Sequence, residues 1–309
     1  MSNFANPSIV ISDEVRTALD EGRGVVALET TIVVHGLPAP INLEVAAMCE
    51  AAVRASGAVP ATVGVLDGRV IVGLSERELE LLATPSLDAA KLSARDVGLA
   101  VGLGRDGATT VAGTVAVANR VGISVMATGG LGGVHRDAQQ SFDESADLTA
   151  LSRTPVLVVA SGVKSILDIG ATLERLDTLG VAVVGYQTTQ FPGFYRTDSG
   201  FSIDWSVANA AEAAAVFLAH LEFATTGLLL ANPVAEDQQL DAQLHERALA
   251  SAFEVARTLG VTGKDVTPVL LAEFARFSGG LSVSVNRDLV IANARLAGEV
   301  AGALSIALS

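Results

Sequence analysis

The sequence predicts an α/β protein with three layers, α/β/α, built on a central mixed and mostly parallel sheet. Short apolar segments alternate with helical ones along the 309 residues, as in sheets covered by helices. Residues 61–74 hold two apolar arms around a tight turn, and this antiparallel pair favours a mixed sheet over a (β/α)₈ barrel, the second choice. Because no linker rich in Pro, Gly or Ser divides the sequence, we expect residues 1–309 to form a single domain.

The first elements follow from their boundary residues. Ser12 can cap a helix that ends near Gly22. Residues 25–28 are all apolar and predict a buried strand that leads into the segment ETT. Residues 42–56 have helical periodicity, and we expect this helix to end at Gly57.

A hairpin and a helix start come next. Asp67 and Gly68 are typical of the type I′ turn that joins two antiparallel strands. Ser75 and Glu78 have the spacing of a capping box, in which each side chain bonds the backbone of the other residue. We therefore expect a helix to begin directly after the hairpin.

Four further strands are predicted, each a short apolar run bounded by turn signals. They cover residues 123–127, 156–160, 181–186 and 227–231. A helix over residues 165–179 is expected to end at Gly180. The last third of the chain is mostly helical in pattern.

Composition excludes several classes of function. The net charge of −14 argues against binding to nucleic acid, which needs a basic surface. No apolar run reaches the roughly 18 residues of a membrane helix, so we expect no membrane partner. The single cysteine, Cys49, excludes an internal disulfide, and the first residues lack a signal-peptide pattern. Both observations predict a cytoplasmic protein.

Polar or glycine-rich segments follow four of the predicted strands. Ligands of open α/β sheets bind at the carboxyl ends of strands, so these segments are expected to share a pocket. They are Glu29 to Thr31, Thr128 to Arg136, Ser161 to Lys164, and Asn232 with Pro233.

Two residues in apolar surroundings have the properties of catalysts. Lys164 is one of three lysines among 20 basic residues, so 17 are arginine (20 − 3). A lysine, unlike an arginine, can lose its proton and form an imine with a carbonyl carbon. Burial would raise the pKa of Glu29 and suit it to proton transfer near neutrality. The alternative for Lys164 is an ordinary surface charge just after a strand.

Two glycine- or threonine-rich segments could bind an anion. The four glycines of residues 128–136 let backbone amides approach a ligand, although a plain glycine turn explains them equally well. Residues 106–115 look like a loop that enters a helix, where amides and the hydroxyls of Thr109 and Thr110 suit a phosphate. Ordinary N-capping is the alternative. With Lys164 and Glu29, an anion site suggests a phosphosugar opened to its aldehyde and held as a Schiff base.

An acidic pair offers a metal site. Asp143 and Asp147 are four residues apart, so on a helix they would share a face, and their oxygens suit Mg²⁺ or Mn²⁺. A solvated acidic face is the commoner explanation of such a pair. Taken alone, His35 and His135 are more typical of hydrogen-bonded structural residues than of catalysts.

Taken together, the motifs resemble those of the pseudouridine-5′-phosphate glycosidase family, also called indigoidine synthase A-like, over essentially the whole chain. In chain order they are ALETTIVVHGLPAP, GAVPATVGVLDGRVIVGL, KLSARDV, GATTVAGT, ATGGLGGVHR, FDESADLTAL, GVKSILDIGATLERLDTLGV, GYQTTQFPGFY, LLANPV and GVTGKDVTPVLL.

The resemblance implies a reaction and its participants. The family reversibly cleaves the C–C glycosidic bond of pseudouridine 5′-phosphate to uracil and ribose 5-phosphate. The resemblance thus implies a pseudouridylate synthase, classed as a carbon–oxygen lyase of the hydro-lyase type. The resemblance further implies Mn²⁺ as cofactor, small molecules as the only partners besides a homotrimer, and an α/β/α fold.

The resemblance also implies roles for individual residues. Lys164 in GVKSILD would be the nucleophile and Glu29 in ALETT the proton donor, with Asp147 and His135 taking part in catalysis. Substrate would contact Lys91, Val111, Ser145, Ala146, Asp147 and Asn286, and Asp143 would bind the metal. Two alternatives stay open: a related lyase acting on another phosphosugar C-conjugate in pigment biosynthesis, and a non-catalytic phosphosugar-binding protein.

Overall fold

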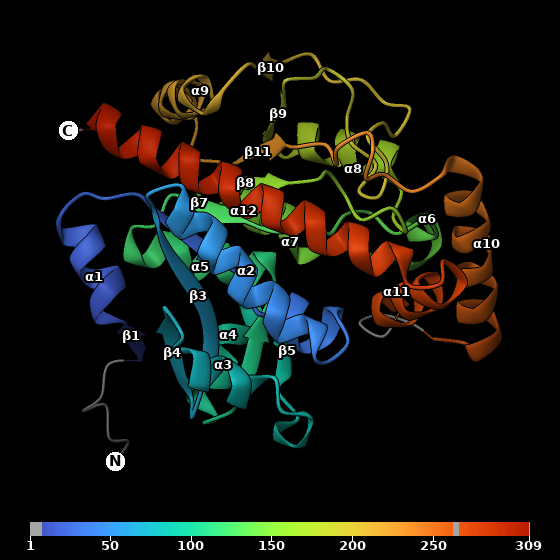
Figure 1. Cartoon of the computed structure of the whole chain (residues 1–309), viewed down its shortest axis with the longest axis horizontal. Helices are drawn as coiled ribbons and strands as arrows, with labels where there is room; N and C mark the ends of the chain where they lie inside the picture. Colours follow the sequence, from blue (N-terminus) through green and yellow to red (C-terminus); the bar gives the residue numbers. More distant parts are fainter. Residues whose placement is uncertain (1–7, 262–265, 309) are drawn as a thin grey trace.

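The computed structural model describes residues 8–261 and 266–308, and the strands in these residues form one eleven-stranded sheet (Figure 1). The main order is β1 (Ile9–Ile11), β4 (Arg69–Val72), β3 (Val59–Leu66), β2 (Val25–Leu28), β7 (Val125–Ala127), β8 (Leu157–Ala160), β11 (Leu228–Ala231), β9 (Ala182–Tyr186) and β10 (Ser206–Val207). Off this path, β6 (Gly107–Thr109) pairs with β3 and with β5 (Ala90–Leu92). Of the described pairings, β3–β4 and β3–β6 are antiparallel and the others parallel, so the predicted mixed sheet is confirmed.

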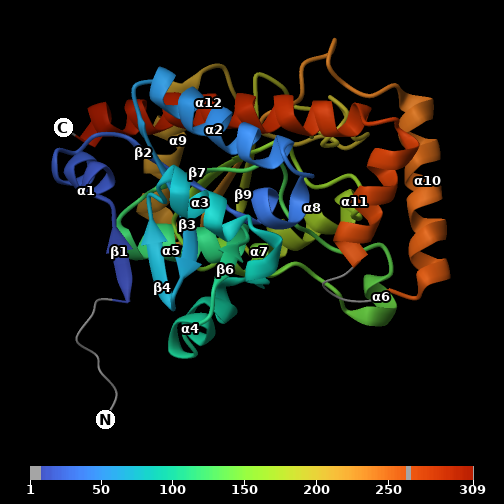
Figure 2. The same ribbon diagram turned by 60° about the horizontal axis from the view of Figure 1, so that its bottom comes forward.

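Helices cover both faces of the sheet. One face carries α2 (Ile41–Ala55), α9 (Ala210–Phe223) and α12 (Leu281–Leu308), and α2 and α12 run side by side across it (Figure 1). The other face carries α5 (Val111–Val121), α7 (Ala146–Leu151) and α8 (Ile169–Thr178). The pair α10 (Ala242–Leu259) and α11 (Val266–Phe277) packs beyond one end of the sheet (Figure 2). The predicted three-layer α/β/α arrangement is therefore confirmed.

β2 shows how the sheet is buried on both faces. Val25 and Ala27 belong to the apolar core beside α5, whereas Val26 and Leu28 belong to the core beside α2 and α12. Successive strand residues point to opposite faces, so a strand covered on both sides needs apolar residues at every position. The run VVAL meets this requirement, and it predicts the strand correctly.

Several predicted boundaries are confirmed. Ser12 caps α1 (Asp13–Asp20) by accepting from the amide of Val15, and Ser75 with Glu78 caps α3 (Glu76–Leu82). Asp67 and Gly68 have φ of 48° and 66°, as a type I′ turn requires.

Two predictions about helices are wrong. The helix expected from residue 165 begins at Ile169, because the Asp168 carboxylate accepts from the amide of Ala171 and caps it there. Lys164 therefore lies in a turn. Asp143 and Asp147 do not share a helix: Phe142, with φ 54°, ends α6 (Ala138–Ser141), and α7 begins only after Ser145.

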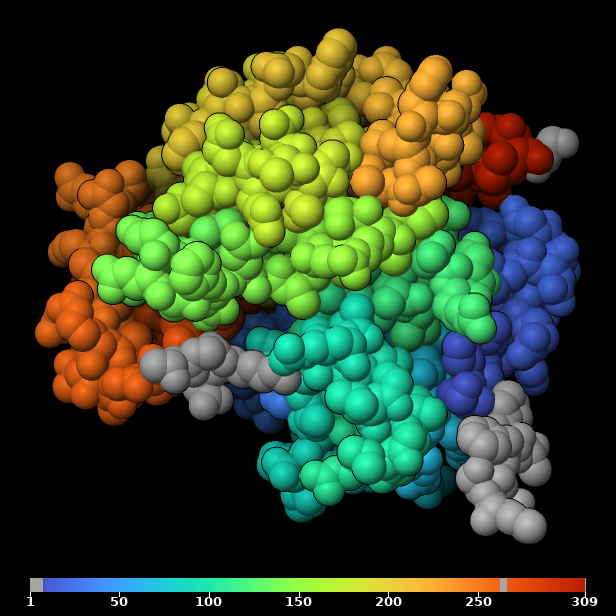
Figure 3. Space-filling view, turned by 180° about the vertical axis from the view of Figure 1, so that it is seen from behind, coloured from blue at the N-terminus to red at the C-terminus, as the bar shows by residue number. Residues whose placement is uncertain are grey.

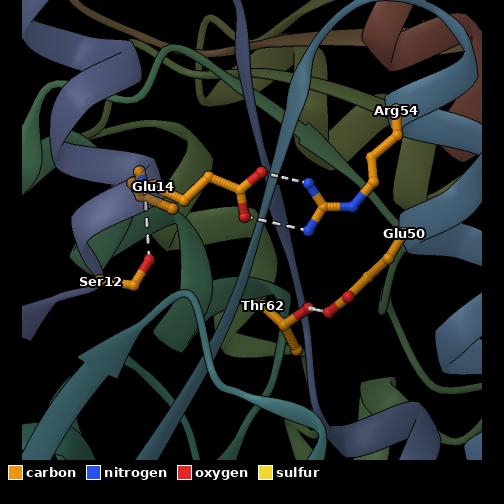
Figure 4. A network of polar contacts seen from close by, with 6 residues as sticks. Ser12, Glu14, Glu50, Arg54 and Thr62 are labelled. Atoms are coloured by element: carbon orange, nitrogen blue, oxygen red, sulfur yellow. Dashed lines mark hydrogen bonds and ion pairs between the residues drawn. The ribbon is translucent and has the colours of Figure 1, made fainter.

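Polar contacts fasten α1 and α2 beside β3 (Figure 4). Arg54 on α2 makes a two-pronged ion pair with Glu14 on α1. The hydroxyl of Thr62 on β3 donates to Glu50 on α2, whose carboxyl pKa is raised by burial. The ion pair is half-exposed and adds only about 0–1 kcal/mol, so these contacts orient the helices more than they stabilise them.

α12 is long and apolar enough to cross a membrane by length and composition, but 56% of its most apolar window is buried in the fold. It approaches the sheet closely at Gly24, where a Cβ would lie 2.7 Å from the backbone carbon of Ala301. α12 is thus the core helix of its layer, and only a glycine fits beneath it at this point.

We predict that Gly24→Ala destabilises the protein by roughly 1–3 kcal/mol, because the new methyl group would collide with the α12 backbone at Ala301 and Gly302 and one of the two segments must move. The matched control is Gly98→Ala in α4 (Ala94–Gly102), where a Cβ meets nothing within 4 Å. This control should stabilise by roughly 0.5–1 kcal/mol through helix propensity. Urea unfolding midpoints measure both changes, and equal midpoints for the two variants would contradict the packing argument.

Candidate active site

Two adjoining cavities lie at the carboxyl ends of β2, β7 and β8. The larger, of about 480 Å³, has many polar residues in its wall, and the smaller, of about 50 Å³, is mostly apolar. Glu29, Lys91 and Lys164 belong to the walls of both. In the view from behind, the segment with β5 and α4 (teal) lies below the segment with α6 and α7 (green) (Figure 3). Residues of both segments line the larger cavity.

Parallel pairing explains why three of the four predicted strand ends meet here. Leu28 is in register with Ala127, and Ala127 with Val159, so Glu29, the loop from Thr128 and the turn at Lys164 start at one sheet edge. The fourth expected end is wrong. Asn232, after β11, lines neither cavity, because its side-chain amide donates to Asn293 at 2.9 Å.

Asn293 is a residue that the sequence analysis missed. It lies on α12, is completely buried, and its amide nitrogen donates to the carbonyls of Thr128 and Gly129 and to the Ser161 hydroxyl, at 2.8, 3.3 and 3.1 Å. With Asn232, it links the segments after β7, β8 and β11. Its spacing of seven from Asn286 places both on one helix face, and this was the available signal.

Glu29 is the buried acid of the site. Its side chain accepts a hydrogen bond from Thr128, and the residue is 8% exposed. Burial raises the pKa of this carboxyl, although the charges of Lys164 and Lys91 and the Thr128 hydrogen bond oppose the rise. The predicted direction is confirmed, and a Glu29 with a raised pKa can hold a proton for donation closer to neutral pH.

Lys164 is half-buried in the turn between β8 and α8. Its backbone amide donates to the carbonyl of Leu131 at 3.1 Å, which fixes the turn against the glycine loop. A side chain at Gly130 would lie 3.5 Å from the Lys164 side chain and collide with the ring of Phe194. Gly130 therefore leaves room for the Phe194 ring beside the Lys164 side chain.

Asp147 holds two walls of the polar cavity together. Its carboxylate oxygens accept from the amides of Ala112, in the first turn of α5, and Gly132, in the glycine loop, each at 2.9 Å. The residue is 5% exposed. Both oxygens are thus occupied by backbone donors, and Asp147 fixes the start of α5 relative to the loop.

Only part of the predicted anion-binding segment lies at the polar cavity. Thr110 caps α5, and Thr110 and Val111 line the polar cavity, where the first-turn amides of a helix favour an anion. The hydroxyl of Thr109 is fully buried and bonds the Val63 carbonyl and Thr114, so it does not face a ligand. Ser145 and Ala146, at the start of α7, complete this wall.

His135 and Asp143 form a pair of possible metal ligands in the polar cavity. His135 Nε2 lies 3.8 Å from an Asp143 carboxylate oxygen, and both residues line the cavity. Within residues 8–261 and 266–308, no three His, Cys, Asp or Glu side chains gather as a metal cage. A metal here would depend on water or substrate oxygens for most of its ligands.

The remaining predicted residues also reach the site. Lys91, on β5, lines both cavities, and Asn286, on α12, lines only the smaller one. Lys264 and part of the motif GVTGKDVTPVLL lie outside the described residues. All the residues to which the family resemblance assigns a role thus line one cavity or both.

We predict that Asp147→Asn destabilises the protein by about 1–3 kcal/mol, because an amide group turns a donor toward a backbone N–H and leaves it unpaired. Urea unfolding measures the loss, and hydrogen exchange should quicken at Ala112 and Gly132. Asp143→Asn, on the same cavity wall but half-buried, is the control and should change stability by less than about 0.5 kcal/mol. Equal effects of the two substitutions would refute the bridging role.

Comparison with known proteins places the chain. The family model described as "Indigoidine synthase A like protein" matches residues 14–303. A protein of Salinispora tropica named pseudouridine-5′-phosphate glycosidase is 57% identical over 93% of this chain and 89% of its own length. One of Frankia alni with the same name is 51% identical over 95% and 81%.

Two solved structures share the fold. The prealnumycin C-glycosynthase AlnA, in complex with ribulose 5-phosphate, has a TM-score of 0.89 and 39% identity over 97% of this chain and 98% of its own. An indigoidine synthase A-like protein of Thermotoga maritima has a TM-score of 0.88 and 34% identity over the same shares. The fold, the motifs and the family match agree, and the chain belongs to the indigoidine synthase A-like family.

Proposed function

We propose that this protein is a pseudouridine-5′-phosphate glycosidase, which reversibly converts pseudouridine 5′-phosphate and water into uracil and ribose 5-phosphate. The observation that carries the proposal is the position of Lys164 and Glu29 in the shared wall of a polar and an apolar cavity. A phosphosugar fits the polar side and a base fits the apolar side, which leaves the bond between them at the two reactive groups. The names of the 57% and 51% identical relatives support the same reaction.

The C–C bond sets the chemical problem. Glycosidases with two carboxylates protonate an oxygen leaving group, and pseudouridine has none at C1′. An imine on Lys164 provides an alternative, because its nitrogen can supply the electrons that expel the carbon leaving group. The residues therefore suit covalent catalysis better than direct hydrolysis.

The proposed sequence begins with ring opening. The Lys164 amine bonds to C1′ and gives up a proton, the bond from C1′ to the ring oxygen breaks, and that oxygen takes the proton, which leaves a lone pair on the nitrogen. Glu29 then protonates C5 of the base. The nitrogen lone pair forms the C1′=N bond as the C1′–C5 bond breaks, and the electrons of that bond restore the C5–C6 double bond of uracil. Water hydrolyses the imine and returns ribose 5-phosphate and Lys164.

The polar cavity would hold the phosphosugar. The amide of Val111, the first residue of α5, favours the phosphate, and Lys91 adds a positive charge to the same wall. Ser145 and Ala146 close the wall beside it. Asp147 supports catalysis in this proposal by keeping the α5 amides and the glycine loop in place.

We further propose Mn²⁺ as cofactor, held by Asp143 with His135 beside it. A carboxylate and an imidazole fit Mn²⁺, which accepts water and phosphate oxygens as its other ligands. When bound, the ion would neutralise phosphate charge. Mn²⁺ titration followed by electron paramagnetic resonance should show at least tenfold weaker binding for Asp143→Asn. Glu144→Gln, which removes a carboxylate already paired with Arg175, should bind normally, and equal affinities would disprove the assignment.

The nucleophile is tested by trapping. Ribose 5-phosphate and borohydride should add a reduced sugar phosphate to Lys164, located by peptide mass spectrometry. Lys164→Arg keeps the charge but cannot form the imine, so both the adduct and the uracil-releasing activity should fall to background. Full activity without any adduct on Lys164 would overturn the mechanism.

The proton donor is tested by pH. Glu29→Gln should lower cleavage by about 10²–10⁴-fold while the Lys164 adduct still forms. A donor works only when protonated, so wild-type cleavage should fall as the pH rises through the raised pKa of Glu29. The residual activity of Glu29→Gln should lack this alkaline fall, and an identical pH profile in both proteins would exclude Glu29 as donor.

A second candidate function comes from the solved relatives. A C-glycosynthase of the same fold, in complex with a pentulose phosphate, favours a lyase that joins a phosphosugar to another carbon acceptor. Absence of uracil release and of the reverse synthesis, with the Lys164 adduct intact, would favour it. Ribose 5-phosphate binding that survives Lys164→Ala without any turnover would indicate a binding protein.

We also propose that the protein is a homotrimer, and light scattering in solution tests this assembly.

A further inference from the structure

The apolar cavity contains unpartnered polar atoms. Six buried side-chain atoms of the described residues have no hydrogen-bond partner, and three of them belong to residues that line this one cavity: Thr31 Oγ1, His35 Nε2 and Asn286 Oδ1. Leaving such an atom unpaired costs about 1–3 kcal/mol, and native proteins rarely keep one without a reason. A ligand that supplies the missing partners accounts for all three atoms at once.

The three atoms come from two separate parts of the fold. Thr31 precedes, and His35 lies on, the π-helix η1 (Ile32–Gly36), whereas Asn286 comes from α12. π-Helical turns are frequent at functional sites. The Asn42 side chain donates to the carbonyl of Val33 at 2.8 Å and holds η1 in this form. The cluster is thus assembled by the tertiary fold and has its own support.

The chemistry of the cluster selects a neutral, flat, polar-edged ring. Ile32, Phe194, Pro268 and Leu271 give the cavity apolar walls. Burial, and then the charge of Lys91, lower the pKa of His35, so its imidazole is neutral near pH 7. Asn286 Oδ1 can only accept, the Thr31 hydroxyl can donate and accept, and His35 Nε2 accepts because the other ring nitrogen hydrogen-bonds the Ala89 backbone. A cyclic imide with alternating N–H and C=O groups can satisfy such a set.

We propose that Thr31 and His35, together with Asn286, recognise the edge of the uracil ring and determine which leaving group the enzyme accepts. The inference rests on the proposed function, because it assigns the base to the apolar cavity. His35, which the sequence alone assigns to a structural role, becomes a specificity residue. Thr31 lines both cavities, whereas His35 and Asn286 line the apolar cavity and not the polar one.

The test uses the synthesis direction, from ribose 5-phosphate and uracil. Thr31→Val keeps the shape and removes the hydroxyl, and His35→Gln and His35→Ala remove the ring. Each should raise the KM for uracil by about 10- to 100-fold, the effect of one buried hydrogen bond. The borohydride adduct of ribose 5-phosphate on Lys164 should form as in the wild type. Thr178→Val and His220→Gln are matched controls, far from both cavities, and should leave KM unchanged.

Methylated bases identify the contacts. Wild-type protein should discriminate against 1-methyluracil or 3-methyluracil, and at least one variant should lose part of this discrimination. Unchanged KM and unchanged discrimination, with normal trapping, would overturn this inference alone. Parallel loss of trapping and uracil binding in all variants would also count against a base-selective role. A wild-type protein that neither traps ribose 5-phosphate nor uses uracil would overturn the proposed function, and this inference with it.

Discussion

The buried amide of Asn293 is the contact on which the site geometry depends. It hydrogen-bonds the segments that follow β7, β8 and β11, and it does so from α12, a helix on one face of the sheet. Within those segments it bonds the carbonyls of Thr128 and Gly129 and the side chains of Ser161 and Asn232, and the Gly129 carbonyl also accepts from the Ser161 amide. A completely buried amide with its donors and its acceptor oxygen in use satisfies them and makes a single arrangement of the loops favourable.

With the loops held in this arrangement, the electrostatics of the site depend on how deeply each ionisable group is buried. Glu29 is buried, and its burial outweighs the charges of the lysines beside it, so that the pKa of its carboxyl is raised. Lys91 and Lys164 are less buried and stand where the polar cavity meets the apolar one. One wall thus holds a carboxyl group with a raised pKa and two lysine side chains, which the proposed reaction would use as proton donor, nucleophile and positive charge.

Asp143 and Asp147 have different roles, although their spacing alone suggested a single metal site. Asp147 is buried and accepts two backbone amides, so it shapes the cavity. Asp143 is more exposed and lies near His135, so it suits a metal ion that keeps several water ligands. The break in the helix at Phe142 is what separates the two roles, because it removes Asp143 from the helix that carries Asp147.

Much of this protein is determined by its sequence. Buried strands such as VVAL, the caps at Ser12 and Ser75 and the turn at Asp67 depend on local periodicity and backbone preferences, which neighbouring residues decide. The motifs also identified the family and the residues to which the resemblance assigns a role in the site.

Only the tertiary structure decided how these residues are used. The partners of Asn293 and Asp147 lie on segments up to 165 residues away in sequence, and Thr31, His35 and Asn286 become unpartnered neighbours of one cavity only when α12 lies across the sheet. Hydrogen-bond satisfaction and burial depend on distances in space, so they become definite only once the chain has folded.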